Sequence, residues 1–124
     1  MLDREEQAPA VVLIQESHIP TEQFPPHIQG FDVKHRGPST REGGVLIYYR
    51  AILPASEAPP TPNDRITAII IDSVAIINVY APVNCTEETE REEFYHQLAA
   101  YASSIRATVT SVIIAGDFNA QIAG

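Results

Sequence analysis

The sequence predicts an α/β fold, on three observations. The last strong strand is a short unbroken apolar run, Val112 to Ala115, and a second such run spans Ala10 to Ile14. Continuous apolar runs of this length, rich in β-branched residues, are typical of strands that are buried on both faces. The third observation is an amphipathic helix between residues 86 and 106, which returns the chain to the last strand.

The composition fits a single domain over residues 1–124 and argues against several classes of protein. Hydrophobic residues make up 44% of the chain, which is too many for a disordered protein. The formal net charge of −8 argues against tight, sequence-independent binding of nucleic acid by the chain unaided, and it fits a surface that recruits a divalent cation.

We expect an intracellular protein without a membrane partner. The only cysteine, Cys85, cannot form an internal disulfide, which favours a reducing compartment. No apolar run reaches the length of a membrane span, and the charged, acidic segment Met1 to Gln7 does not look like a signal peptide.

The strands are expected, in chain order, at residues 9–15, 30–35, 45–53, 66–72, 74–81 and 112–115. Asp72 and Ser73 are suited to a tight hairpin turn between two of them. Residues 54–63 contain four prolines without hydrophobic periodicity, so an exposed loop is expected there.

The helix has a clear beginning and a clear buried face. Thr86 is a suitable N-cap, and the acids that follow it, Glu87, Glu88 and Glu90, favour the positive end of the helix dipole. These acids could also mark a second metal site, but solvated capping charges are the simpler interpretation. One apolar stripe is formed by Phe94, Leu98, Tyr101 and Ile105.

Polar side chains follow the last strand directly. Gly116 allows a tight turn, and Asp117 and Asn119 are spaced so that both point the same way in extended backbone, with Phe118 turned back into the core. Open α/β sheets bind their ligands at the carboxyl ends of strands, so this couple is a candidate site. The alternative is an Asx-type turn that only ends the strand.

Glu16 is a second acid placed directly after a buried strand. If the first and last strands are parallel in one sheet, Glu16 and Asp117 lie on the same rim, where a hard cation is the simplest partner for two carboxylates. Mg²⁺ commonly takes only one or two protein carboxylates. The alternative for Glu16 is a solvated strand end.

Three further side chains are candidates for holding a phosphate. Tyr80 ends a strand because Pro82 cannot donate to a sheet ladder, and Asn84 follows in the loop beyond. Arg41 precedes Gly43 and Gly44 and can reach a phosphate from there. The alternatives are an amphipathic core-edge tyrosine for Tyr80 and a solvated loop arginine for Arg41.

Taken together, four short motifs occur in an order that resembles the endonuclease/exonuclease/phosphatase superfamily. They are Gln15-Glu16-Ser17-His18, Gly43-Gly44-Val45, Asn78-Val79-Tyr80-Ala81-Pro82 and Gly116-Asp117-Phe118-Asn119-Ala120. Within it, the segment from Tyr80 through Glu92-Glu93-Phe94-Tyr95 to Ala120 is most similar to the apurinic-type endonuclease domain of LINE-type retrotransposons of the RTE group. The resemblance covers residues 9–124.

This resemblance implies a fold, a reaction and a role for each candidate residue. The fold would be a partial DNase I-like two-sheet α/β sandwich with flanking helices, and the reaction Mg²⁺-dependent hydrolysis of phosphodiesters, with Mn²⁺ as the alternative ion. Glu16 would match the family's metal ligand, and Tyr80, Asp117 and Asn119 its catalytic residues. Asn84, one position further from the tyrosine than in some relatives, would match a phosphate-binding asparagine.

Two departures from the family pattern concern the ends of the chain. The family begins with a strand that ends in an active-site asparagine and closes with an aspartate-histidine segment, and neither is found between Met1 and Gly124. The resemblance therefore leads us to expect an incomplete domain, a fragment rather than a competent enzyme, and a plasmid-nicking assay with Mg²⁺ tests this expectation.

Three functions remain open from the sequence. The first is the nuclear DNA endonuclease of a retrotransposon, which would nick target DNA and expose a 3′ hydroxyl for a reverse transcriptase domain in the full-length protein. The second is another phosphoesterase of the superfamily, acting on inositol phosphates, a sphingolipid or RNA ends. The third is a catalytically dead relic or an interaction domain.

Overall fold

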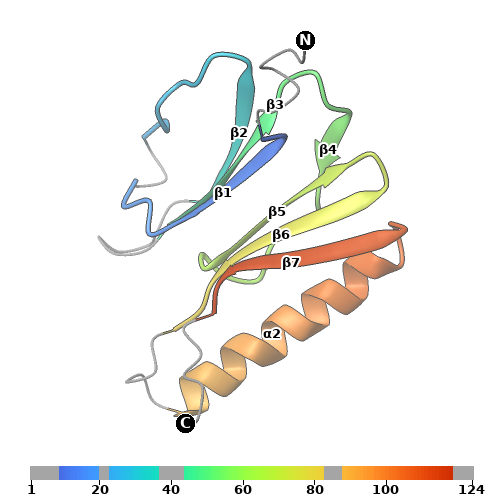
Figure 1. The fold of residues 1–124 in the computed structure, drawn as a ribbon. Coiled ribbons are helices and arrows are strands. Elements are labelled where there is room, and N and C mark those ends of the chain that lie inside the picture. The colour runs from blue at the N-terminus through green and yellow to red at the C-terminus, as the bar shows by residue number, and fades with distance from the viewer. Residues whose placement is uncertain (1–8, 20–22, 37–43, 83–87, 119–124) are drawn as a thin grey trace, which may run out of the picture.

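The computed structural model of the chain describes residues 9–19, 23–36, 44–82 and 88–118. Two sheets face each other, and the helix runs along the outer side of one of them (Figure 1). The expected α/β class with a two-sheet arrangement is therefore confirmed, and the described part of the chain contains one helix. The elements are β1 (Val11–Gln15), β2 (Phe31–Arg36), β3 (Val45–Arg50), β4 (Ala55–Glu57), β5 (Ile66–Ile71), β6 (Val74–Tyr80), α2 (Glu88–Arg106) and β7 (Ser111–Asp117).

The two sheets differ in the relative direction of their paired strands. Sheet A consists of β1, β3 and β2 in that order, and all of its pairs are antiparallel. Sheet B has the order β4-β5-β6-β7, and its β6–β7 pair is parallel. Parallel neighbours need a crossover connection, and α2 supplies it. The carboxyl ends of β6 and β7 therefore lie side by side at one rim of sheet B.

Alternation along β6 assigns each of its faces to a different layer. Ala75, Ile77 and Val79 are buried together with the apolar side chains of α2. Residues 78 and 80 lie on the opposite face of the pleat and point toward sheet A. The helix contributes its predicted stripe to this core, and all four residues of the stripe are buried, namely Phe94, Leu98, Tyr101 and Ile105.

The last strand is less buried than its apolar sequence predicts. Ile113 and Ile114 of β7 keep 51% and 38% of their surface exposed. In the described part of the chain, β7 is the outer strand of sheet B and pairs with β6 alone. The expectation of a strand covered on both faces was therefore wrong. Adjacent side chains of β7 point to opposite faces, and among the described residues no strand beyond β7 shields them from that side.

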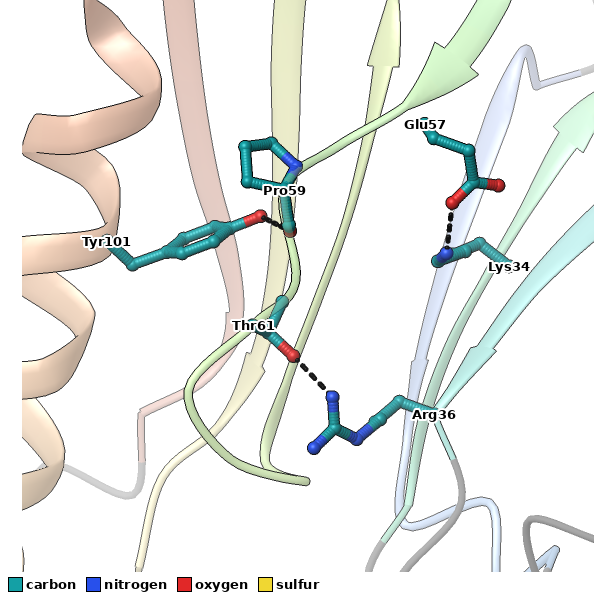
Figure 2. Close-up of polar contacts among 6 residues, drawn as sticks. All are labelled: Lys34, Arg36, Glu57, Pro59, Thr61 and Tyr101. Atoms are coloured by element: carbon teal, nitrogen blue, oxygen red, sulfur yellow. Dashed lines mark hydrogen bonds and ion pairs between the residues drawn. The ribbon is translucent and has the colours of Figure 1, made fainter.

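Residues 54–63, predicted to be an exposed loop, include a short strand and make hydrogen bonds to other elements. Ala55–Glu57 form β4, whose first residue pairs with Ile71 of β5. Beyond β4, the Tyr101 hydroxyl donates to the Pro59 carbonyl oxygen at 2.6 Å, and Arg36 donates to the Thr61 hydroxyl at 2.9 Å (Figure 2). The loop prediction missed β4 because a three-residue edge strand contains too few residues to show a period.

The remaining local predictions concern the turn at Asp72, the strand from Val45, the N-cap Thr86 and membrane spans. The tight turn between β5 and β6 is present, and Asp72 adopts the left-handed backbone conformation (φ +58°) that such turns use. The strong strand predicted from Val45 ends earlier, at Arg50. Thr86, the predicted N-cap, lies outside the described residues. Within the described residues, no helix is both long and apolar enough to span a membrane.

Candidate functional site

Tyr80 and Asp117 are direct neighbours at the rim of sheet B. They are the last residues of β6 and β7 and are paired in the parallel register. Paired residues of adjacent strands point to the same face, so both side chains lie on the face that is turned toward sheet A. The Ala81 amide donates to the Asp117 carbonyl oxygen at 2.8 Å and carries the ladder one residue further.

Gly116 allows β7 to lie this close to β6. Its φ is +132°, and a Cβ at this position would lie 2.1 Å from the Val79 carbonyl oxygen. Only glycine fits such an approach. The sequence interpretation of Gly116 as the residue of a tight turn was wrong, because Gly116 lies inside the strand, opposite Val79.

Asn78 joins the two sheets directly beside the rim. Its side chain is fully buried, and its amide nitrogen donates to the carbonyl oxygens of Ile14 and Leu46 at 3.0 and 2.9 Å. Its amide oxygen accepts a hydrogen bond from the Gln15 side chain at 2.7 Å. These bonds hold the end of β1 against β6, one residue before Glu16.

Glu16 leaves β1 in an unusual backbone conformation. Its φ is +54°, and His18 follows with φ +56°. Left-handed backbone is uncommon for residues other than glycine, and it costs about 1–2 kcal/mol per residue. The Ser17 amide donates to the Gly44 carbonyl oxygen at 3.2 Å and ties this bend to sheet A. From this bend, the Glu16 carboxylate accepts a hydrogen bond from Tyr80.

Glu16 and Asp117 both act on Tyr80, but they come from elements other than those that the sequence predicted. Parallel strands of one sheet were expected to carry the two acids, but β1 belongs to sheet A and β7 to sheet B. The acids instead approach Tyr80 from the two facing layers. Hydrophobic runs alone cannot distinguish these arrangements, because both bury the same apolar strands.

The electrostatics of Tyr80 reflect this crowding. Burial raises the pKa of its phenol first, followed by a hydrogen bond to the Glu16 carboxylate and by the negative charges of Glu16 and Asp117. Arg65 acts in the opposite direction and lowers the pKa. The phenol therefore stays protonated at neutral pH and can donate a hydrogen bond.

The donor set suits a hard divalent cation. At this solvent-accessible rim, the Glu16 carboxylate hydrogen-bonds the Tyr80 phenol, and Asp117 is the strand partner of Tyr80. In the described ranges, no group of three or more His, Cys, Asp or Glu side chains is arranged to hold a metal ion. Hard divalent cations bind carboxylate oxygens, and some commonly take only one or two of them from the protein together with water and substrate oxygens.

Three of the predicted site residues, Arg41, Asn84 and Asn119, lie outside the described residues. Three residues to which the sequence reasoning gave no role are found beside the site: Gln15, Arg65 and Asn78. An amide within an otherwise apolar strand was the available clue for Asn78, since buried polar groups require hydrogen-bond partners. Nothing in the sequence alone points to Arg65.

Known proteins share this fold. A model of the Endonuclease/Exonuclease/phosphatase family matches residues 4–122. The comparison with curated proteins gives no match.

Among solved structures, a 3′ phosphatase from Neisseria bound to a product DNA hairpin aligns with a TM-score of 0.74 at 20% identity, over 93% of this chain and 49% of that one. An AP endonuclease from Archaeoglobus fulgidus gives 0.68 at 25% identity, with the same coverage of both chains. The catalytic domain of APE2 from Xenopus laevis gives 0.72 at 17%, over 97% and 53%. The chain thus spans about half the length of these structures.

Proposed function

The chain belongs to the endonuclease/exonuclease/phosphatase family. On that premise, we propose that it hydrolyses phosphodiester bonds of DNA with a divalent cation. Mg²⁺ is the ion that we favour. The single observation that carries the proposal is the meeting of Glu16, Tyr80 and Asp117 at one accessible rim, from three strands and two sheets. The acids can supply a general base and a cation ligand, and the phenol can supply a hydrogen-bond donor to the phosphate.

Each residue has a distinct part in the proposed reaction. The Asp117 carboxylate orients a water molecule and accepts its proton as the water oxygen bonds to phosphorus; the bond from phosphorus to the leaving oxygen breaks, and that oxygen takes up a proton from solvent and becomes a hydroxyl. The Tyr80 hydroxyl donates a hydrogen bond to a phosphate oxygen or to the leaving oxygen, whose negative charge grows in the transition state. Glu16 would hold the cation, which when bound supplies positive charge that offsets the charge developing on the phosphate.

The residues outside the described ranges complete this proposal. Asn119 follows Asp117 at the spacing that lets both side chains point the same way, and it would hold the phosphate. Asn84 and Arg41 would contribute further donors to the substrate. These assignments rest on the motifs of the sequence.

DNA is the substrate that we favour. The Neisseria structure named above holds a product DNA hairpin, and the motif pattern of this chain resembles retrotransposon endonucleases. In a longer protein, the domain would nick target DNA in the nucleus and leave a 3′ hydroxyl for a reverse transcriptase domain. A small phosphoester is the alternative substrate, since the family name includes phosphatases.

A nicking assay on supercoiled plasmid tests the proposal. We expect Mg²⁺-dependent nicking by the chain, abolished by EDTA, and a loss of about 100-fold or more in Asp117→Asn, because removal of a general base typically costs that much. The matched control is Asp32→Asn, an exposed carboxylate on β2, the outer strand of sheet A opposite β1, which should nick at the rate of the wild type. Nicking that survives in Asp117→Asn would refute the assignment, and hydrolysis of inositol phosphates without nicking would favour the alternative substrate.

A further inference from the structure

Arg65 lies directly before β5 and contacts Tyr80 in three ways. The Tyr80 amide donates to the Arg65 carbonyl oxygen at 2.9 Å. In return, the Arg65 guanidinium donates through Nη1 to the Tyr80 carbonyl oxygen at 3.2 Å. Its Cζ atom also lies 5.5 Å from the centroid of the Tyr80 ring, which is the range of a cation–π contact. Backbone and ring of Tyr80 are thus held by the same residue.

Arg65 is held in turn by Asn63. The Asn63 side-chain oxygen accepts from the Arg65 amide at 2.9 Å, and its side-chain nitrogen donates to Gln97 of α2 at 2.6 Å. The Asn63 carbonyl oxygen accepts from the Thr61 hydroxyl at 3.3 Å. Thr61 also receives the hydrogen bond from Arg36 of sheet A (Figure 2). The segment that presents Arg65 is therefore tied to the helix and to the facing sheet.

The position of Tyr80 makes such a support useful. Its phenol is hydrogen-bonded to the Glu16 carboxylate, which comes from the facing layer, and Asp117 is paired with Tyr80 on the neighbouring strand. A substrate phosphate that accepts from the hydroxyl would replace the bond to Glu16, and the ring would then lose that support. The guanidinium over the ring face adds about 0.5–1 kcal/mol of support at an exposed site, and it is independent of the hydroxyl.

We propose that Arg65 is a positioning residue, which holds the Tyr80 ring in one orientation so that its hydroxyl faces the substrate phosphate. This inference rests on the proposed function, and it adds a residue that acts through Tyr80 without itself touching the reacting atoms. The Asn63 linkage to α2 and to sheet A keeps Arg65 in place.

Ring NMR of the whole chain, labelled with ¹³C at its tyrosine rings, tests the geometry without any need for activity. The chain has five tyrosines, and the Tyr80 resonance is assigned by its loss in Tyr80→Phe. In Arg65→Gln, we expect the Tyr80 resonance to move toward that of a solvent-exposed tyrosine, while those of Tyr48 and Tyr101 stay in place. Arg65→Lys keeps the charge but not the forked donor, and it should give a smaller shift.

The control is Arg106→Gln, an exposed arginine in the last turn of α2, which should move no tyrosine resonance near the site. An unmoved Tyr80 resonance in Arg65→Gln would overturn the inference, and so would movement of all the tyrosines together, which indicates general loss of structure. If Arg65→Gln fails to fold, the comparison of Arg65→Lys with the wild type decides the question.

Kinetics on plasmid DNA separate positioning from direct binding. Arg65→Gln should lower kcat about 10- to 100-fold, the usual cost of a misplaced group, with KM changed less than about twofold. In a Tyr80→Phe background, the same substitution should have little further effect. An equal loss in both backgrounds would show that Arg65 acts independently of Tyr80. If the wild type does not nick DNA, the proposed function fails, and the NMR experiment still decides the orientation of Tyr80.

Discussion

Two junctions hold the sheets together, a buried amide beside the site and a set of half-buried and exposed charges at the edge formed by β2 and β4. At the first, Asn78 makes three hydrogen bonds to sheet A with no exposed surface. At the second, Lys34 bonds Glu57 at 2.7 Å and Arg36 bonds Thr61, both within reach of water (Figure 2). The first junction links the two sheets through buried hydrogen bonds, and the second links them through polar contacts that water can reach.

The difference indicates where the geometry of the site is determined. A buried carbonyl that loses its partner costs about 1–3 kcal/mol, because no water replaces the bond. An exposed ion pair contributes about 0–1 kcal/mol, because water solvates both charges when it breaks. The position of Glu16 relative to Tyr80 therefore depends on Asn78, and the β2–β4 edge adds modest stability.

The largest expected effect is at Gly116, where β7 approaches β6 beside the buried junction. Gly116→Ala places a Cβ against the Val79 backbone and should lower the free energy of unfolding by about 3 kcal/mol or more. Gly30→Ala is the matched control, since Gly30 also has a positive φ (+84°) but has open space around it. It should cost only about 1–2 kcal/mol, the price of the backbone conformation. Equal losses in urea denaturation would contradict the close approach.

The second effect measures the buried junction itself. Asn78→Ala leaves the Ile14 and Leu46 carbonyl oxygens without their partner and should cost about 2–4 kcal/mol. Gln15→Ala removes only one of the three bonds and should cost about 1 kcal/mol. Urea denaturation of both variants gives the comparison. If Asn78→Ala is no worse than Gln15→Ala, the junction is not what holds β1 against β6.

A smaller effect is expected at Tyr101, which ties α2 to the segment after β4. Burial raises the pKa of its phenol above the ordinary value of 10.0. The unfolded chain therefore loses this proton first, and the stability that depends on the neutral phenol is present below pH 10 and is lost as the pH rises through the folded pKa.

Tyr101→Phe tests this sign. The variant should be less stable than the wild type by about 1 kcal/mol at neutral pH, since it lacks the bond to the Pro59 carbonyl oxygen. Above pH 10, its stability should fall less steeply than that of the wild type. Denaturation curves between pH 7 and 11 measure both quantities, and parallel curves throughout would show that Tyr101 does not contribute to the alkaline loss.

The smallest effect belongs to the ion pair at the β2–β4 edge. The side chains of Lys34 and Glu57 keep 34% and 80% of their surface exposed. A double-mutant cycle with Lys34→Met and Glu57→Gln should give a coupling energy below about 1 kcal/mol, and it should shrink further in 1 M salt. A coupling as large as the loss in Asn78→Ala would remove the distinction between the two junctions.

Local patterns in the sequence predicted most of the elements. The stripe of α2, the turn at Asp72 and the strands around residues 45 and 74 depend on neighbours within a few residues, and the structure contains all of them. Phe118 also packs against the core as its alternation with Asp117 predicts. The short strand β4 was missed because its pairing with β5, and not its own composition, makes it a strand.

The candidate site was predictable only in part. Glu16, Tyr80 and Asp117 were found because each is a polar residue at the end of an apolar strand, and the structure does bring these three together. Their supports escaped prediction, since Arg65 contacts Tyr80 across 15 positions of sequence and Asn78 contacts Gln15 across 63. Hydrophobic periodicity reflects residues that are close in the sequence, so it does not predict contacts between distant ones.

By itself, the sequence determined most of the segments that form strands and helix, and which polar residues stand at their ends, because apolar periodicity is a property of neighbouring residues. Only the tertiary structure decided that Glu16 and Asp117 come from different sheets, that Gly116 admits a neighbouring backbone and that Asn78 binds the layers together. The physical reason is that these features arise from close packing between segments far apart in the chain, where a single Cβ or an unpaired carbonyl decides which arrangement is stable.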